Sequence, residues 1–201
     1  MSADGRVRLL ALGGVVGPLA FIGCWAVAGA VTHGYSPIDD AISDLAAVDA
    51  PTRVAMTTGF VVFGVGLVAF GLALRHSLGG GAWIAAIATG ACTIAVAATP
   101  LGGWSGDSVH ATFAGLGYAA IVLVPALAAP EFATRSRAGW ARTAWLTAVA
   151  AAGCLVASTF GPAHGAWQRL GLTVGDLWII GTAVALATAS GPFVRAENEA
   201  A

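Results

Sequence analysis

Long apolar segments constrain this chain more than any other feature of its sequence. A helix of about 20 residues spans the roughly 30 Å hydrocarbon core of a bilayer. Six segments reach about that length, namely residues 9–31, 54–74, 82–101, 111–129, 143–161 and 177–194. Backbone groups in lipid must pair within a helix or a closed barrel. Because the segments are continuously apolar and lack the alternation of barrel strands, they predict an all-α integral membrane bundle of six transmembrane helices.

The composition indicates a chain that lipid can solvate. Of its 201 residues, 58% are hydrophobic and 9% are charged, whereas about a quarter of the residues of a soluble domain are charged. The nine basic residues are all arginine, and the formal net charge is −1. This distribution provides no basic stripe for binding a nucleic acid. We therefore expect membrane lipid, and no nucleic acid, among the partners.

The arginines predict how the chain is oriented. Cytoplasmic loops of membrane proteins carry an excess of basic residues. A cytoplasmic N-terminus leaves only Arg53 and Arg169 outside. The sequence therefore predicts a multi-pass protein of the plasma membrane with its N and C termini in the cytoplasm. The arginines that this topology places inside are Arg6, Arg8, Arg75, Arg135, Arg137, Arg142 and Arg195.

The first apolar segment has an alternative interpretation. Arg6 and Arg8 precede it, and Ala26, Val27 and Ala28 near its end are typical of a cleavage site. This combination also occurs in secretory signals, but their apolar cores are about 7 to 15 residues long. Because segment 9–31 is longer than such a core, we favour an uncleaved first span.

Glycine is abundant within the apolar segments. The chain has 28 glycines, and four of them, Gly59, Gly64, Gly66 and Gly71, lie in segment 54–74. Small residues let membrane helices approach closely. We favour packing within one chain as their role. The alternative is a homo-oligomer assembled through glycine-rich spans.

The second half of the chain contains an internal similarity. Alignment of the third and fifth apolar segments pairs Trp83 with Trp145, Cys92 with Cys154, and Pro100 with Pro162. Each segment is followed by the pattern His-x-x-aromatic-x-x-Leu-Gly, which begins at His110 and His164. We interpret residues 1–201 as a single transmembrane domain with a hairpin repeat, 82–129 and 143–194. Both copies would run in the same direction across the membrane.

The first outer loop predicts a short interfacial helix. Ser36 suits a helix N-cap, Pro37 suits the first helical position, and Asp39 lies where a capping box places its acid. An apolar stripe with helical spacing follows, formed by Ile38, Ile42 and Leu45. We expect this helix to lie on the bundle or on the membrane surface.

Two acids in this loop are close enough in sequence to repel each other. Asp40 and Asp44 are four residues apart, and like charges at that spacing repel on a helix. We favour Arg169 as their partner, because a guanidinium can bridge carboxylates. The alternative is functional, with Asp40, Asp44, His110 and His164 converging on a cation or forming a catalytic acid and base. No His-x-x-x-His spacing supports a metal, so we predict no metal site, and the sequence identifies no cofactor.

None of the six apolar segments has an ionisable group in its middle. Asp176 is assigned to the outer loop before segment 177–194. Intramembrane charges commonly mark ion pathways and proton relays. Their absence makes a proton-coupled transporter or a channel an unfavourable interpretation.

Several strings carry a resemblance to a known family. They are Gly34-Tyr35-Ser36-Pro37 and Ile42-Ser43-Asp44-Leu45 in the first outer loop, and Gln168-Arg169-Leu170 near the C-terminal end. With these strings the chain resembles the domain of unknown function 998 family of small bacterial and archaeal polytopic membrane proteins. The resemblance implies six spans and marks the first outer loop as the family signature. It implies no activity, because the family has none established.

These observations lead to two functional hypotheses. The first is a polytopic membrane protein that binds a lipid or amphiphile at its extracytoplasmic face, where polar side chains gather. Its candidate ligand-binding residues are Tyr35, Ser36, Ser43, Asp44 and Arg169. The alternative is a membrane-embedded acid/base enzyme, such as a lipid hydrolase or cyclase. Its candidate catalytic residues are Asp40, Asp44, His110 and His164.

Overall fold

The computed structural model of the protein describes residues 3–188, and over this range every regular element is a helix. The sequence prediction of an all-α protein is therefore confirmed for the described part. The elements, in chain order, are α1 (Ala3–Ala11), α2 (Gly13–Val31), the short 3₁₀ helix η1 (Ile42–Ala46), α3 (Arg53–Ser77), α4 (Ala82–Ala98), α5 (Asp107–Thr134), α6 (Ala138–Phe160) and α7 (His164–Ala187).

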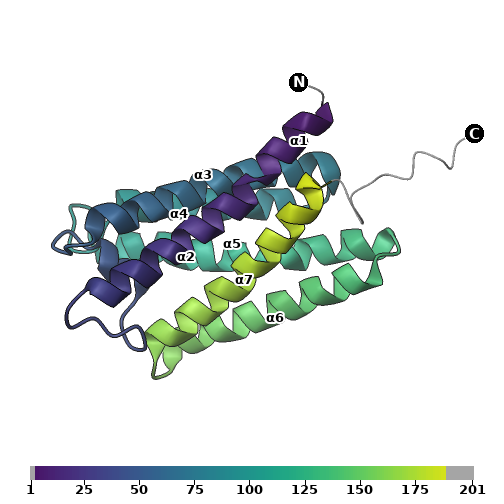
Figure 1. Ribbon diagram of the computed structural model, residues 1–201. Coiled ribbons are helices and arrows are strands. Elements are labelled where there is room, and N and C mark those ends of the chain that lie inside the picture. Colours follow the sequence, from purple (N-terminus) through teal and green to yellow (C-terminus); the bar gives the residue numbers. More distant parts are fainter. Residues whose placement is uncertain (1–2, 189–201) are drawn as a thin grey trace, which may run out of the picture.

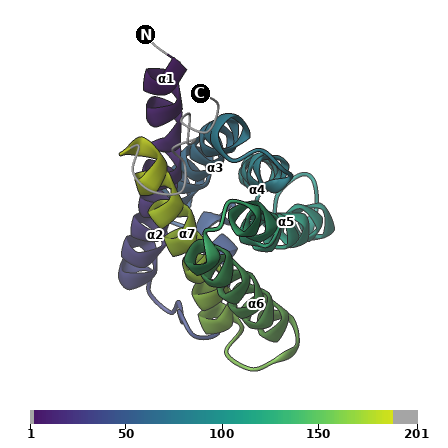
Figure 2. The ribbon, with the colours of Figure 1, turned by 90° about the vertical axis from the view of Figure 1, so that its right-hand side faces the viewer.

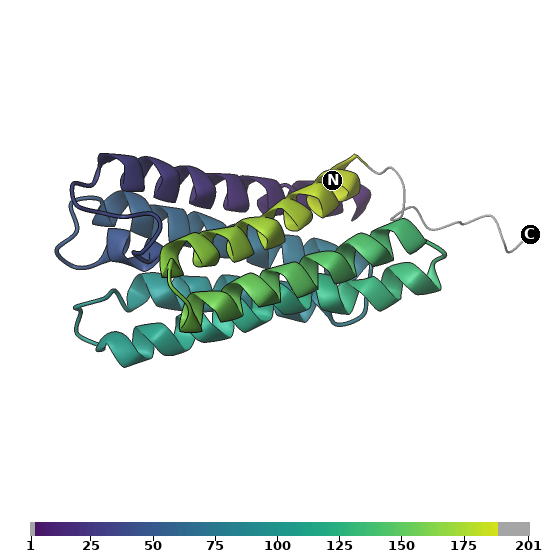
Figure 3. The same ribbon diagram turned by 90° about the horizontal axis from the view of Figure 1, so that it is seen from below.

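The helices from α2 to α7 form a closed ring (Figures 1 and 2). Each of them packs against its neighbours in the chain, and α7 returns to pack against α2. Figure 3 shows α7 lying between α2 and α6. Aromatic rings fill part of the interior, with the ring of Phe21 centred 5.0 Å from that of Phe63 and 5.7 Å from that of Phe60.

Five stretches of helix are long and apolar enough to cross a membrane by length and composition. They are Gly5–Val31, which joins α1 and α2, and the helices α3, α5, α6 and α7. Helix α4 is also apolar but has 17 residues, about 25 Å at 1.5 Å per residue. Large apolar side chains such as Val16, Leu19, Leu146 and Val149 are exposed on the outside of the ring. Lipid is the solvent that suits such a surface.

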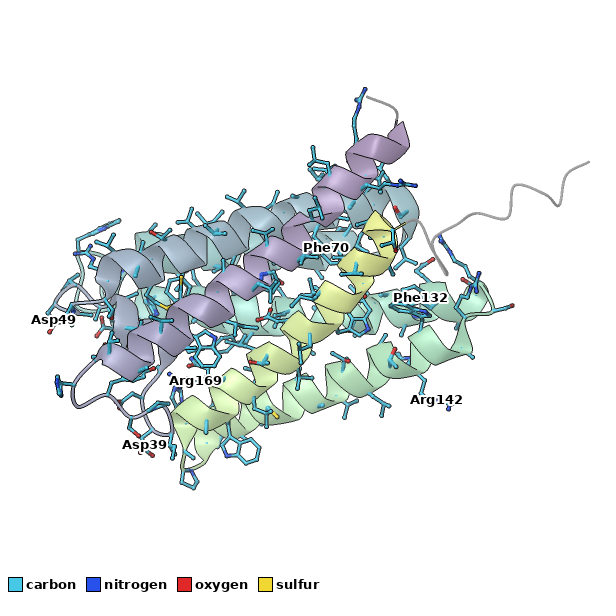
Figure 4. The ribbon with its side chains drawn as sticks, viewed as in Figure 1. Asp39, Asp49, Phe70, Phe132, Arg142 and Arg169 are labelled. Carbon is cyan, nitrogen blue, oxygen red and sulfur yellow. The ribbon has the colours of Figure 1, made fainter. Side chains whose placement is uncertain are left out.

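The two ends of the bundle differ in charge. We call the end formed by residues 32–52, 99–106 and 161–163 the cap end. Figure 4 shows Asp39 and Asp49 at this end and Arg142 at the opposite end. The charge asymmetry therefore agrees with the positive-inside argument, although the orientation itself stays a prediction. Arg195 lies outside the described residues.

The predicted start of the sixth apolar segment was wrong, and residues 189–194 of that segment lie outside the described residues. Helix α7 begins at His164 and ends at Ala187, whereas the sequence predicted 177–194. The prediction began after Asp176 because a span was expected to exclude charge. In the structure Gln168, Arg169 and Asp176 are all buried, so they face the bundle interior and not lipid. A membrane helix tolerates polar residues on such a face.

The predicted interfacial helix is replaced by a turn and a 3₁₀ segment. Ser36 Oγ accepts a hydrogen bond from the Asp39 backbone N–H at 3.3 Å, as an N-cap would. The helix does not continue, and η1 begins only at Ile42. Ile42 and Leu45 are buried, as the apolar stripe predicted, but Ile38 is exposed. The apolar side chains through which the loop docks on the bundle are therefore those of η1.

The glycines of α3 pack against helices of the same chain. A Cβ on Gly59 would lie 2.8 Å from Cβ of Cys24, and one on Gly66 would lie 2.5 Å from the Gly13 carbonyl oxygen. Gly64 and Gly71 likewise leave no room for a side chain beside α4. These close approaches support the interpretation that the α3 glycines serve packing within the chain.

Candidate functional site

Arg169 ties α7 to the first loop at the cap end. Its side chain is buried, and Nη1 donates hydrogen bonds to the carbonyl oxygens of Pro37 at 2.9 Å, Asp40 at 3.0 Å and Gly165 at 2.9 Å. Nη2 donates to the hydroxyl of Tyr35. A planar guanidinium suits this set of acceptors because its donors point in fixed directions.

Two aromatic rings complete the surroundings of Arg169. Its Cζ lies 5.4 Å from the centre of the Trp25 ring and 5.4 Å from the centre of the Tyr35 ring, within the range of cation–π attraction. Figure 4 shows Arg169 where α7 faces α2. Beside it is a shallow groove lined by Trp25, Ala26, Gly29, Ala30, Tyr35, Pro37 and Arg169.

The predicted pairing of Arg169 with the two loop carboxylates was wrong. Arg169 bonds to backbone carbonyls, and the carboxylates bond to backbone N–H groups within their own turns. Oδ2 of Asp40 accepts from Ser36 N–H at 2.7 Å, and Oδ2 of Asp44 accepts from Ala41 N–H at 2.9 Å. Such local bonds are available to Asp without long-range packing. Both carboxylates therefore have backbone N–H donors in their own turns and do not need Arg169 as a partner.

Gln168 links the loop to the interior of the bundle. Its Oε1 accepts a hydrogen bond from Ile42 N–H at 2.8 Å, and its Nε2 donates to the hydroxyl of Tyr118. The side chain is buried. Gln168 was not among the predicted site residues. Its position next to Arg169 in the resemblance string was the only signal that could have identified it.

His110 presents a free nitrogen to the interior. The side chain is 4% exposed, and Nδ1 lies 2.7 Å from the carbonyl oxygen of Thr99. Because a carbonyl oxygen only accepts, Nδ1 carries the proton of this bond, and Nε2 of a neutral ring is then an acceptor. Nε2 is buried and has no hydrogen-bond partner within the described residues.

His164 occupies a related position but a different environment. Its Nδ1 faces the carbonyl oxygen of Ser158, near the end of α6. Each of the two histidines therefore closes a turn between consecutive helices. The ring of His164 is only partly buried, and it does not line the cavity that His110 lines.

A cavity lies beside η1 and is lined by α2, α3, α4, α5 and α7. Its volume is about 60 Å³ for the centres of water-sized spheres, and a water molecule needs roughly 10–15 Å³ on that measure. Most of its wall is apolar, with Phe21, Phe60, Phe63 and Phe113 among the lining side chains. The polar lining side chains are Ser43, Thr89, Thr93, His110, Tyr118 and Gln168.

The polar lining groups favour a ligand that donates hydrogen bonds. The hydroxyls of Thr89 and Thr93 each donate to the carbonyl four residues earlier, at 2.9 Å, which leaves their oxygen lone pairs as acceptors. His110 Nε2 is an acceptor as well. Apolar walls with a few convergent polar groups are characteristic of small-molecule sites.

Asp44 lies in the electrostatic field of both histidines. Partial burial raises the pKa of its carboxyl above the ordinary value, the Ala41 N–H bond lowers it, and the nearby charge of Asp40 raises it again. His164 and His110 act in the opposite direction and lower the pKa. The net direction is upward, although the side chain keeps substantial contact with solvent.

The structure divides the predicted site residues among three places. Ser43 and His110 line the cavity, and Tyr35 and Arg169 line the groove. Ser36, Asp40, Asp44 and His164 line neither. Within residues 3–188, no three His, Cys, Asp or Glu side chains gather as a metal site would require.

Asp176 is the ionisable residue that the sequence prediction misplaced. It lies within α7 and not in an outer loop, and its side chain is fully buried. Both carboxyl oxygens lack a hydrogen-bond partner among the described residues. The expectation that no ionisable group lies in the middle of a span was therefore wrong.

A ring of apolar helices, most of them long enough to cross a bilayer, is the architecture of a polytopic helical membrane protein. A family profile described as "Protein of unknown function (DUF998)" matches residues 15–185. The chain belongs to this family, as the resemblance in the loop and α7 strings predicted. Comparison of the chain with curated proteins and with solved structures found no match.

Proposed function

We propose that the protein binds a lipid or another amphiphile in the cavity beside η1. The observation that carries this proposal is Nε2 of His110, which has no hydrogen-bond partner within residues 3–188 and is buried at a cavity with mostly apolar walls. A buried polar atom without a partner is unfavourable by about 1–3 kcal/mol. A ligand hydroxyl or amide that donates to Nε2 would remove that penalty.

The shape of the cavity limits the ligand. A volume of about 60 Å³ accommodates a small polar group or the end of a chain, so the rest of an amphiphile would extend toward lipid or solvent. The polar group would contact His110 and Gln168, and the apolar part would contact Phe21 and Phe63. Ile42 and Ser43 of η1 form the roof, so η1 would move when the ligand enters.

The proposed orientation places the cavity on the outer side. We infer six spans, with α4 as the short one, and cytoplasmic N and C termini in the plasma membrane. The cluster of arginines opposite the cap end supports this orientation. Attachment of a membrane-impermeant thiol reagent to Ser108→Cys, at an exposed position in the first turn of α5, in a chain without its natural cysteines, would test it in intact cells. Labelling only after the membrane is permeabilised would contradict it.

Identification of molecules retained during purification tests the binding proposal. The protein would be extracted from its membrane in a mild detergent, and bound molecules identified by native mass spectrometry. We expect the wild type to retain an amphiphile that His110→Phe does not retain. His164→Phe is the matched control, because it also removes a bond to a helix-end carbonyl but lies outside the cavity. Equal retention by both variants would contradict the proposal.

Asp44 supports an acid/base enzyme as a second candidate. Its pKa is raised, and both histidines influence it electrostatically, which is a common property of catalytic carboxyls. Asp44→Asn keeps an oxygen that can accept the Ala41 N–H bond but removes the acid. An enzyme would lose turnover of lipid esters in this variant with its thermal stability retained. A lipid-binding protein would keep its bound amphiphile.

The internal repeat and the oligomeric state of the chain are two further proposals. The similar bonds of His110 and His164 to carbonyls of the preceding helices support the proposed duplication of 82–129 and 143–194. A homo-oligomer through glycine-rich spans would use glycines that face open space, such as Gly115, Gly153 and Gly181. Mass measurement of the detergent-solubilised protein tests the oligomer.

A further inference from the structure

Asp176 is a carboxyl group in the interior of the bundle. It lies in the middle of α7, on the same face as Arg169 and Leu172, which are seven and four residues earlier. Its side chain is fully buried, and neither Oδ1 nor Oδ2 has a hydrogen-bond partner within residues 3–188. The cap end, where the acids of the first loop lie, precedes the start of α7 at His164 and is therefore more than three helical turns away.

The surroundings of Asp176 follow from two contacts that bracket it. Toward the cap end, the guanidinium of Arg169 lies over the Trp25 ring of α2. Toward the opposite end, a Cβ on Gly14 of α2 would lie 2.9 Å from Cβ of Ala183. Because α7 runs antiparallel to α2, Asp176 lies between these two levels. The buried residues of α2 in that interval are Gly17, Pro18 and Phe21, none of which has a polar side chain.

No charged partner for Asp176 is evident in the elements packed against α7, which are α1, α2, α3, α5, α6 and η1. Most of their titratable side chains lie near helix ends, and none of them forms a hydrogen bond or ion pair with Asp176. The titratable residues of these elements with described side chains are Arg6, Arg8, Cys24, Asp44, Arg53, Arg75, His76, Asp107, His110, Tyr118, Glu131, Arg142 and Cys154.

The cavity approaches Asp176 from the cap end. Leu172 and Ile121 both line the cavity, and Leu172 lies one helical turn before Asp176. A Cβ on Gly175, the residue next to Asp176, would lie 3.3 Å from Ile121. These contacts place Asp176 just beyond the cavity floor. Water in the cavity would find hydrogen-bond partners in Gln168 and Tyr118, so a short chain of water molecules can reach this floor.

We propose that Asp176 is a proton-binding site of the membrane interior, which exchanges its proton with the solution at the cap end through the cavity. A bare carboxylate is strongly unfavourable where neither a counter-ion nor a hydrogen-bond donor is present. The surroundings of Asp176 therefore favour the neutral carboxylic acid, with its proton on Oδ1 or Oδ2. Movement of Leu172 and Ile121 would admit water and allow the proton to leave.

Infrared spectroscopy tests the first part of this proposal. The wild type and Asp176→Asn would be reconstituted in phosphatidylcholine vesicles near neutral pH. We expect the carbonyl stretch of a protonated carboxyl in the wild type and its loss in Asp176→Asn. Asp44→Asn is the control, because its acid lies at the cap end, and it should keep the band. A wild type without this band, or a band that persists in Asp176→Asn, would overturn the proposal.

Deuterium exchange tests the route. On transfer to D₂O the band should shift to lower frequency as the carboxyl proton is replaced. Ala114 lines the cavity, and Ala114→Leu should slow this shift several-fold by filling it. An unchanged rate in Ala114→Leu, with its thermal stability retained, would overturn exchange through the cavity. The infrared signal does not depend on a bound amphiphile, so its outcome is separate from that of the binding proposal.

Discussion

Nη1 of Arg169 donates a hydrogen bond to the carbonyl oxygen of Asp40 at 3.0 Å and so connects residues 129 positions apart in the chain. The bond requires α7 to approach the first loop very closely. Gly165 makes that approach sterically allowed, since a Cβ at this position would lie 2.2 Å from the same Asp40 oxygen. The attachment of the loop therefore depends on a charged residue and on a missing side chain one helical turn away.

Gly165→Ala should destabilise the fold. The added methyl group would meet backbone oxygens of Asp40 and Pro37, which cannot rotate away, and overpacking of this kind costs about 1–3 kcal/mol. Thermal unfolding in detergent measures the effect. Gly181→Ala in the same helix is the control, because open space surrounds Gly181 and alanine is the better helix former there by about 0.5–1 kcal/mol. Equal stability of the two variants would contradict the steric argument.

Arg169→Lys should not preserve the loop attachment. A lysine ammonium has no second nitrogen for the Tyr35 hydroxyl and no planar group to lie over the Trp25 and Tyr35 rings. Arg169→Met would also leave the Pro37 and Asp40 carbonyls without their donor. Each buried unsatisfied group costs about 1–3 kcal/mol, so methionine should destabilise more than lysine. Arg53→Lys is the control, since Arg53 is an exposed arginine at the same end. A lysine variant as stable as the wild type would disprove the geometric requirement.

Gln168→Leu should loosen η1 without unfolding the bundle. The substitution removes the acceptor of the Ile42 N–H bond at 2.8 Å and costs about 1–3 kcal/mol through the buried donor left behind. Hydrogen–deuterium exchange should become faster at the Ile42 amide. The Val48 amide, which donates to the Leu101 carbonyl at 3.1 Å, is the internal control. Faster exchange at both amides to the same extent would indicate general unfolding instead.

The raised pKa of Asp44 predicts the sign of a pH effect on stability. An acid whose pKa is higher in the folded state than its ordinary value of 3.8 favours folding when protonated. Its contribution is therefore complete below about pH 3.8 and is lost as pH rises through the raised pKa. The wild type should gain thermal stability relative to Asp44→Asn as the pH falls through this interval. A difference that is constant with pH, or that grows as the pH rises, would refute the assignment.

Several features of the fold were predictable because they depend on local sequence. An apolar segment of sufficient length is helical in lipid whatever its neighbours are, so the first five segments correspond closely to helices of the structure. The bond from the Asp39 N–H to Ser36 Oγ was predictable because it is a local one, although it closes a turn and not the predicted helix. His110 was identified because it begins the pattern His-x-x-aromatic-x-x-Leu-Gly after the third apolar segment.

The cavity could not be predicted in the same way. Its walls come from α2, η1, α3, α4, α5 and α7, and no short string of residues indicates that these side chains meet. The partners of Arg169 were predicted incorrectly for the same reason. Charge alone favoured Asp40 and Asp44, whereas the closeness permitted by Gly165 brought backbone carbonyls within reach.

Local sequence was sufficient to establish the solvent of this protein, its helical character and the unequal charge of its ends, because hydrophobicity and charge act over a single segment. The three-dimensional packing was needed to reveal which polar residues turn inward. Asp176 interrupts an apolar pattern and was therefore read as part of a loop, yet it is enclosed by helices distant in the chain. Whether a side chain is buried depends on the helices packed around it, and these helices come from parts of the chain that only the tertiary structure brings together.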